Sequence, residues 1–306
     1  MSDRVKKILK NPKLLFLTLG QRGFFNWIPD STYLKIAYRI KMGGGKKLDL
    51  ENPQSFNEKI QWLKLNDRNP KHTMLVDKYE AKRLVANSIG ESHIIPTLGV
   101  WDNFDDIDFS VLPNQFVLKC THDSGGLVIC RDKKSFNKKN AKKKINKCLK
   151  HNFYYGQREW AYKNIKPRII AEKYMEDETT KKLGSLGLTD YKIFCFNGKP
   201  EFVYVSCGLE NHETAQISFL TMEWKLAEFK RSDYQGLTVL PDKPKGFNEM
   251  IEYARKLAEN EKFVRVDFYE INSNVYFSEI TYYPCSGFMP FEPIDWDNKI
   301  GKMLKI

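Results

Sequence analysis

The residues best suited to do chemistry lie in a C-terminal stretch, residues 263–283, which reads FVRVDFYEINSNVYFSEITYY. Two apolar, aromatic-rich runs flank a polar break at residues 272–274, and this is the pattern of a β-hairpin with a short loop. Charged and hydroxyl side chains alternate with apolar ones along both runs, and successive side chains of a strand point to opposite faces. The stretch therefore predicts a hairpin with one polar face.

The polar face of this hairpin brings two carboxylates together. If the loop has three residues, Asp267 lies opposite Glu279 and Arg265 lies opposite Thr281, and Phe277, Glu279 and Thr281 share one face of the second strand. Opposed carboxylates repel each other, and a divalent cation between them would remove the repulsion. Mg²⁺ is held by one or two carboxylates and by substrate phosphates, and Arg265 could meet a phosphate. A polar face that only contacts solvent is the alternative interpretation.

A second candidate is a phosphate clamp. A strand that contains Lys119 is followed by a turn with Ser124, Gly125 and Gly126, and then by a strand over residues 127–130. The glycines let backbone N–H groups approach an anion closely, and the lysine adds a point charge. An ordinary hairpin turn is the alternative here, because Ser-Gly-Gly is a common turn sequence.

The remaining periodicity predicts the elements that must position these residues. Ser55 and Glu58 have the spacing of a capping box and open a helix, and Asn197-Gly198 indicates a second hairpin. Asp77 and Lys78 are expected near the start of a single helix. We expect helices over about residues 5–19, 33–42, 56–65, 74–88, 133–150 and 247–260, and strands over 94–96, 99–101, 115–120, 127–130, 167–175, 189–196, 201–205 and 215–220.

Composition narrows the class of protein. The chain has 306 residues, of which 42% are hydrophobic and 29% charged, so it can form a globular core. Its net charge of +12 suggests an acidic partner, which could be a nucleotide, an anionic polysaccharide, an anionic membrane or a nucleic acid. The lysine-rich helix over residues 133–150 is interpreted as a solvated face, because no nucleic-acid-binding motif accompanies it. The basic, aromatic N-terminal section could lie on a membrane surface, but we expect it to pack on its own domain.

The cysteines indicate a reducing, cytoplasmic setting. The six cysteines are scattered without a CxxC pair, and several lie in apolar runs. The five histidines show no metal-ligand spacing, which argues against a zinc site.

Eight short segments follow one another along the chain in this order: NPQSFNEKIQWLK, DKYEAK, IIPTLGVWD, FVLKCTHDSGG, PRIIAEKYM, DYKIFCFNGKP, RVDFY and SEITYYPCSG. Together they resemble the TupA-like ATP-grasp family, which is named after a teichuronopeptide biosynthesis protein. They cover most of the chain from about Leu48 onward. The resemblance implies an α+β ATP-grasp fold, in which two antiparallel-sheet lobes hold a nucleotide between them. We expect a mainly helical N-terminal region over residues 1–70 and an ATP-grasp domain over 71–306, with a central lobe at about 115–175 and a C-terminal lobe at about 176–306.

The resemblance also implies site residues, with ATP and Mg²⁺ as the cofactors. Lys78 would lie near the nucleotide, Lys119 and Lys192 would contact its phosphates, and the turn with Ser124, Gly125 and Gly126 would cover them. Arg265 would meet the γ-phosphate, so that Arg265 and Lys192 are the catalytic candidates. Many ATP-grasp enzymes have Asn two residues after the last metal-binding Glu, whereas this chain has Thr281. The adenine and ribose would be held by Glu172, Tyr174 and Met175 with Glu178 or Asp177, and the metal by Asp267, Glu279 and Thr281.

Such a site implies a carboxylate–amine ligase that forms an acyl phosphate. The family implies an acidic sugar or cell-surface polysaccharide as the acceptor and an amine as the second substrate. A sugar phosphotransferase and a glycosyltransferase of the same pathway are the alternatives. Against the glycosyltransferase, a DxD motif occurs only at residues 106–108, in an acidic loop. A cytoplasmic location, with contact to the inner face of the membrane, would suit this pathway.

Overall fold

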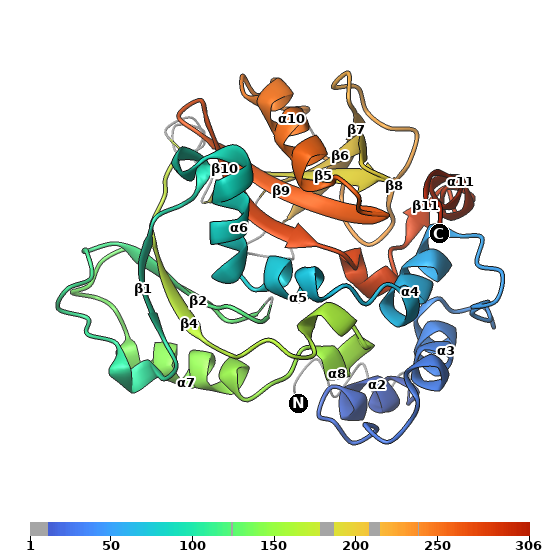
Figure 1. The fold of residues 1–306 in the computed structure, drawn as a ribbon, viewed down its shortest axis with the longest axis horizontal. Coiled ribbons are helices and arrows are strands. Elements are labelled where there is room, and N and C mark those ends of the chain that lie inside the picture. Colours follow the sequence, from blue (N-terminus) through green and yellow to red (C-terminus); the bar gives the residue numbers. More distant parts are fainter. Residues whose placement is uncertain (1–11, 124, 178–186, 208–214, 238) are drawn as a thin grey trace.

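The computed structural model describes residues 12–123, 125–177, 187–207, 215–237 and 239–306. Two antiparallel sheets dominate it, with strand orders β1-β4-β2-β3 and β10-β9-β5-β6-β7, and β8 pairs with β11 in a small third sheet. The two large sheets lie beside each other, and helices cover their outer sides (Figure 1). No helix within these described ranges is both long and apolar enough to cross a bilayer.

The four-stranded sheet is covered on one face by α7. Ala141 and Ile145 of this helix are buried in one cluster with Phe116 and Leu118 of the sheet. Because side chains alternate along a strand, Lys119 points to the other face, toward the five-stranded sheet. The elements are β1 (Thr97–Trp101), β4 (Ile169–Lys173), β2 (Phe116–Cys120), β3 (Leu127–Cys130) and α7 (Lys138–Leu149).

The five-stranded sheet is covered by α10. Met250 and Ala254 of this helix belong to the main hydrophobic cluster, together with Ile193 and Val266 of the sheet. The alternate residues of the same strands carry the charges of the candidate site. The elements are β10 (Asn274–Thr281), β9 (Phe263–Ile271), β5 (Asp190–Phe196), β6 (Lys199–Cys207), β7 (Gln216–Thr221), α10 (Phe247–Leu257) and the small sheet of β8 (Lys230–Arg231) and β11 (Phe291–Glu292).

The N-terminal part of the described chain is helical, as expected. Ser55 caps its helix with the predicted capping box to Glu58, and Tyr33 and Leu34 belong to a separate small hydrophobic cluster. Its helices are α2 (Leu14–Gly20), α3 (Asp30–Lys41), α4 (Phe56–Asn66), α5 (Pro70–Val76) and α6 (Glu80–Ile89).

Further short elements follow along the described chain. They are the helices α8 (Tyr154–Gln157) and α11 (Trp296–Met303) and the 3-10 turns at Glu91–His93, Phe104–Asp106, Trp160–Tyr162 and Pro284–Gly287.

The single helix expected over residues 74–88 is wrong, because the chain breaks between α5 and α6. Asp77 has an extended backbone, and its Oδ1 accepts hydrogen bonds from the N–H groups of Tyr79 and Glu80. The N–H of Lys78 donates to the carbonyl of Thr121 at 3.0 Å. The break therefore turns Lys78 toward the loop between β2 and β3, where an uninterrupted helix would not place it.

Candidate active site

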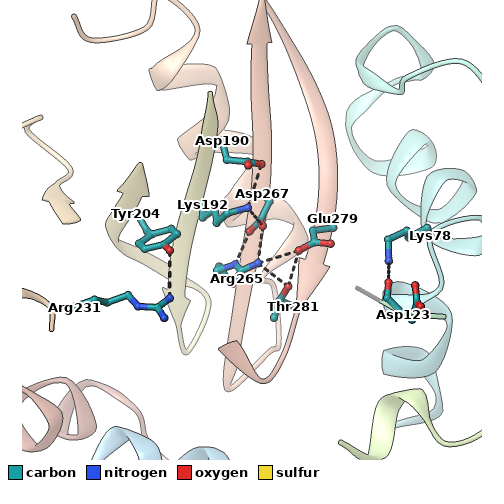
Figure 2. A network of polar contacts seen from close by, with 10 residues as sticks. All are labelled: Lys78, Asp123, Asp190, Lys192, Tyr204, Arg231, Arg265, Asp267, Glu279 and Thr281. Atoms are coloured by element: carbon teal, nitrogen blue, oxygen red, sulfur yellow. Dashed lines mark hydrogen bonds and ion pairs between the residues drawn. The ribbon is translucent and has the colours of Figure 1, made fainter. Parts of the chain in front are cut away.

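Asp267 on β9 lies at the centre of a buried polar network (Figure 2). Its side chain is 0% exposed, and Lys192 on β5, directly opposite, places Nζ 2.7 Å from its Oδ2. Lys192 also lies 3.1 Å from Oδ1 of Asp190. Burial disfavours the charge of Lys192, but the two carboxylates outweigh this effect and raise the pKa of the lysine. Lys192 is therefore a fixed cation at neutral pH and cannot act as a base there.

The predicted pairing across the hairpin is confirmed. Glu279 lies opposite Asp267, and Thr281 lies opposite Arg265. These pairs bring two carboxylates, a guanidinium and a hydroxyl together on one face of β9 and β10.

The hairpin reaches this register by a route that the sequence did not predict. Its turn consists of Asn272 and Ser273 alone, both with positive φ, and an irregularity between Phe277 and Glu279 restores the pairing. The expectation that Phe277 shares a face with Glu279 is wrong. Phe277 pairs with the buried Phe268, so it lies on the opposite, core face.

Arg265 is the cation that separates the two carboxylates. Its Nε and Nη2 donate to the two oxygens of Asp267 at 2.7 Å each. Nη2 also donates to Oε1 of Glu279 and Oγ1 of Thr281, both at 3.0 Å. The guanidinium thus compensates the repulsion between the two opposed carboxylates. In the sequence-based prediction, a divalent cation had this role.

Glu279 is the member of this network best suited to bind a metal. Its side chain is 35% exposed and lines a cavity of about 210 Å³. Burial favours its neutral form, but the charges of Lys192, Lys78, Arg265 and Lys119 outweigh burial and lower its pKa to about 2. It is therefore ionised at neutral pH, as Mg²⁺ requires of a ligand.

The donor set around Glu279 fits Mg²⁺ in type. Glu279 and Asp267 supply hard carboxylate oxygens, and each such oxygen can accept from more than one partner. The oxygens of Asp267 are already bound by Arg265 and Lys192, and the hydroxyl of Thr281 bonds Arg265 and Glu279. The ligand roles of these three residues remain predictions, in which Glu279 carries the most accessible carboxylate.

A second cavity, of about 220 Å³, adjoins the first and is lined on one side by apolar side chains. Tyr174 and Met175 line it, as the predicted adenine hinge requires. Four residues line both cavities, so the two form one continuous cleft between the large sheets. They are Lys119, Leu127, Asp190 and Tyr269.

Glu172, which lines the second cavity, pairs with two lysines, of which Lys119 lines both cavities. Its oxygens lie 2.6 Å from Nζ of Lys119 and 2.6 Å from Nζ of Lys82. Burial raises the pKa of this carboxyl, but the two ammonium groups outweigh burial and hold it at about 2. Glu172 therefore keeps Lys119 pointed into the cleft.

The glycine turn lies over the more polar cavity. Nζ of Lys78 donates to the carbonyl oxygen of Asp123, and the N–H of Gly126 donates to Oδ1 of Asp123 at 2.9 Å. A Cβ on Gly126 would approach Sγ of Cys120 to 2.6 Å, so only glycine fits there, whereas Gly125 has open space. The turn thus lies where it could cover phosphates, although its own carboxylate already uses the Gly126 N–H.

The remaining predicted binding residues are either outside the described residues or already engaged in hydrogen bonds within the protein. Ser124 and Glu178 lie outside the described residues. Oδ1 of Asp177 accepts the N–H of Asn272 at 3.1 Å, so this carboxylate holds the hairpin turn. Tyr174 accepts a hydrogen bond from Nε of Arg131 at 3.3 Å.

The sequence reasoning missed several cleft residues. Asp190 could have been found, because it precedes Lys192 by two positions on a predicted strand and so shares its face. Lys82 stands in the DKYEAK segment, but nothing local links it to Glu172. Tyr204 was also missed: it pairs with Lys192 across β5 and β6, and its hydroxyl accepts from Nη1 of Arg231 at 3.3 Å.

These residues form an ordered row. In strand order, Tyr204, Lys192, Asp267 and Glu279 lie side by side across four strands of one sheet. Figure 2 shows Arg231 beyond Tyr204 at one end, and Lys78 with Asp123 beyond Glu279 at the other.

A family model described as TupA-like ATPgrasp matches residues 58–305. No curated protein matches the chain. These two findings leave the family as the most specific assignment.

Solved structures of low identity also match. The D-alanine–D-alanine ligase from Bacillus anthracis, complexed with ATP, is 16% identical over 68% of this chain and 55% of its own, with a TM-score of 0.38. The corresponding ligase from Helicobacter pylori is 15% identical over 82% and 70%, with a TM-score of 0.39. A RimK domain ATP-grasp protein from Sphaerobacter thermophilus is 10% identical over 76% and 69%, with a TM-score of 0.40. The chain thus spans about half the length of the first of these.

Proposed function

Because the chain belongs to the TupA-like ATP-grasp family, we propose that it is an ATP-dependent carboxylate–amine ligase that joins an amine to a uronic-acid-containing cell-surface polysaccharide or its precursor. The observation that carries the proposal is the cleft itself. It runs from an apolar cavity beside Tyr174, past Lys119 and Lys78, to the carboxylates and Arg265 of the hairpin. Positioning and charge neutralisation are what phosphoryl transfer needs from a protein.

ATP would lie along this cleft. The apolar cavity suits the adenine ring, and Lys119 and Lys78 are within the polar cavity that would take the phosphates. Glu279, with Asp267 and Thr281, would hold Mg²⁺, which would supply charge neutralisation to the phosphates. Lys192 and Arg265, both paired with Asp267, would keep positive charge beside the γ-phosphate.

The reaction would take place in two steps. A carboxylate oxygen of the acid forms a bond to the γ-phosphorus while the bond to the bridging oxygen breaks, which gives an acyl phosphate and ADP. The amine nitrogen then forms a bond to the acyl carbon, the carbon–oxygen bond to phosphate breaks, and the nitrogen loses a proton to water. Arg265 would stabilise the negative charge that moves between the oxygens in both steps.

The acid would approach from the end of the row marked by Tyr204 and Arg231. The cavity proposed for the phosphates is lined by Lys78, Lys192 and Glu279, and Figure 2 shows Tyr204 and Arg231 on the side of Lys192 away from Glu279. An in-line attack on the γ-phosphate would then come from the side of Tyr204 and Arg231. Arg231 lies there with Nε and Nη2 bound to the carboxylate of Asp233 at 2.8 and 2.7 Å. The side chain of Asp233 is 44% exposed, so a substrate carboxylate could replace it on the guanidinium.

The chain would work in the cytoplasm, close to the inner face of the membrane. The proposed use of ATP and the unpaired thiols of the described chain support a cytoplasmic location. Contact with the membrane is supported by the N-terminal helical region, which exposes Phe24 (62%) and Trp27 (79%). Lys13 and Arg22 are near them in the sequence. Aromatic side chains with basic neighbours suit the interface of an anionic bilayer.

Mass spectrometry of the acceptor after reaction tests the proposal. The enzyme would be incubated with ATP, Mg²⁺, a panel of uronates and their polymers, and a mixture of amino acids. We expect ADP release that depends on a uronate, together with an acceptor mass gain that matches an amide. An acceptor mass gain of one phosphoryl group would contradict the ligase and indicate a phosphotransferase. Transfer from a nucleotide sugar, without ATP use, would replace it by a glycosyltransferase.

A further inference from the structure

Two thiols and a carboxylate converge beneath the glycine turn. Sγ of Cys120, Sγ of Cys148 and a carboxylate oxygen of Asp123 all lie within 4.8 Å of one another. They come from three different elements: the end of β2, the end of α7 and the loop between β2 and β3. The spacing of the histidines argued against zinc, and the sequence could not indicate this cluster because the two cysteines are 28 positions apart.

The three side chains have nearly the spacing of metal ligands. In a tetrahedral zinc site with zinc–sulfur bonds of about 2.3 Å, neighbouring sulfur ligands are about 3.8 Å apart. Moving from a separation of at most 4.8 Å to this value needs only small side-chain adjustments. We propose that Cys120, Cys148 and Asp123 form a binding site for a thiophilic divalent cation such as Zn²⁺, separate from the magnesium site in the cleft.

The surrounding structure holds this arrangement in place. Nε2 of His122 donates toward the carbonyl oxygens of Cys148 and His151, at 3.2 and 3.1 Å, which fastens the loop to the end of α7. The N–H of Cys120 donates to the carbonyl of Gly126 at 2.8 Å, which closes the loop from the other side. Cys120 is fully buried, whereas Cys148 is partly exposed and gives an ion a way in.

Binding would have a defined stoichiometry and consequence. One Zn²⁺ replaces two thiol protons, forms two zinc–sulfur bonds and one zinc–oxygen bond, and leaves a fourth position for water. A carboxylate has about four lone-pair sites, so Asp123 can bind the ion while its Oδ1 continues to accept the Gly126 N–H. The cation would then tie α7 to the loop that Lys78 contacts through the Asp123 carbonyl, and so would fix the cover of the polar cavity.

Cobalt is the first probe, because only thiolate ligands give sulfur-to-cobalt charge-transfer absorption. The full chain, kept reduced with a phosphine, would be titrated with Co²⁺ alone. We expect the band to saturate at one equivalent, to disappear in Cys148→Ser and to weaken in Asp123→Asn. Cys130→Ser, which alters a buried thiol of the same sheet outside the cluster, should leave it unchanged. Absence of the band in the unaltered protein, or its equal loss in Cys130→Ser, overturns the proposal.

A second measurement avoids any effect of the variants on folding. The unaltered protein would be alkylated with iodoacetamide, with and without one equivalent of Zn²⁺, and each cysteine followed by peptide mass spectrometry. Cys285 is the internal control, because it is also partly exposed but lies outside the cluster. We expect Zn²⁺ to slow alkylation of Cys148 about tenfold or more, while Cys285 reacts at its original rate. Equal rates for Cys148 with and without Zn²⁺ contradict the site.

Discussion

Arg265 binds both oxygens of Asp267 from two positions earlier in the same strand, at 2.7 Å each, and this pair organises the candidate active site. Residues two apart on a strand share a face, so the guanidinium needs little rearrangement to reach the carboxylate. The same guanidinium reaches Glu279 on the next strand. A phosphate bound beside Glu279, as proposed, would therefore meet a cation that is already oriented.

Replacing Glu279 by Gln should abolish magnesium-dependent ATP turnover without unfolding the protein. The side chain is 35% exposed, so the neutral amide can remain solvated. The loss of one charge that is aimed at the reacting centre should lower kcat by about 100-fold or more. The measurement is ADP release as a function of Mg²⁺ concentration, with circular dichroism to verify the fold.

Glu270→Gln is the matched control for this variant. Glu270 lies on the same hairpin and accepts the N–H of Gly246 through its side chain, away from the cleft residues. It should keep most of the activity. Full turnover in Glu279→Gln would contradict the assignment of Glu279 as a metal ligand.

Lys119→Ala should weaken ATP binding. In the unaltered protein, ATP with Mg²⁺ at about 100 times its dissociation constant should add about 2.7 kcal/mol to the free energy of unfolding and so raise the Tm. Removing Lys119 takes one cation from both cavities, so the same ATP concentration should raise the Tm much less. Lys142→Ala removes an equal charge from the exposed side of α7 and should leave the shift intact. Equal shifts in both variants would speak against Lys119.

The pairing of Glu172 with two lysines should make stability depend on pH. Its pKa is about 2 in the folded protein, below the ordinary 4.5, so its contribution is fully present above about pH 5 and is lost as pH falls toward 2. This shift corresponds to a contribution on the order of 3 kcal/mol. The free energy of unfolding, from urea titrations between pH 7 and pH 3, should therefore fall more steeply for the unaltered protein than for Glu172→Gln. Parallel curves for the two proteins would contradict the ion pairs.

How far the sequence predicts this site depends on how local each feature is. Alternation along residues 263–283 was enough to predict that Asp267 faces Glu279, because both lie in runs with a clear period of two. The two-residue turn and the irregularity beside Ser278 shift the register in opposite directions. The two shifts cancel from Glu279 onward, so Asp267 still pairs with Glu279 although the predicted loop was one residue too long. Phe277 lies between the turn and the irregularity, where only the first shift applies, and its predicted face was therefore wrong.

Features that join distant segments could not be read from local patterns. Lys82 on α6 contacts Glu172 on β4, which lies 90 residues further along the chain. The chain break before α6 is likewise held by a distant residue, Arg168, whose Nη2 lies 2.9 Å from Oδ2 of Asp77. The convergence of Cys120 with Cys148 likewise depends on how α7 packs on its sheet. Such contacts follow from tertiary packing, for which the sequence has no periodic signal.

Arg231→Ala should impair use of the acid more than use of ATP. Charge-assisted hydrogen bonds contribute about 1.5–3 kcal/mol, so the KM for a uronate acceptor should rise about tenfold or more while the KM for ATP changes little. Lys230→Ala is the control, because Lys230 precedes it on β8 and is 57% exposed beside Glu292. A rise in the KM for ATP alone would indicate that Arg231 binds the nucleotide and not the acid, and would contradict the prediction.

The most direct test of the central claim is trapping of the acyl phosphate with hydroxylamine. The full chain would be incubated with ATP, Mg²⁺ and the uronate that stimulates ADP release, with hydroxylamine in place of the amine. The account predicts a uronyl hydroxamate, formed in equal amount to ADP and free phosphate, and its loss in Glu279→Gln. ADP release with a stable phosphoester and no hydroxamate would contradict it.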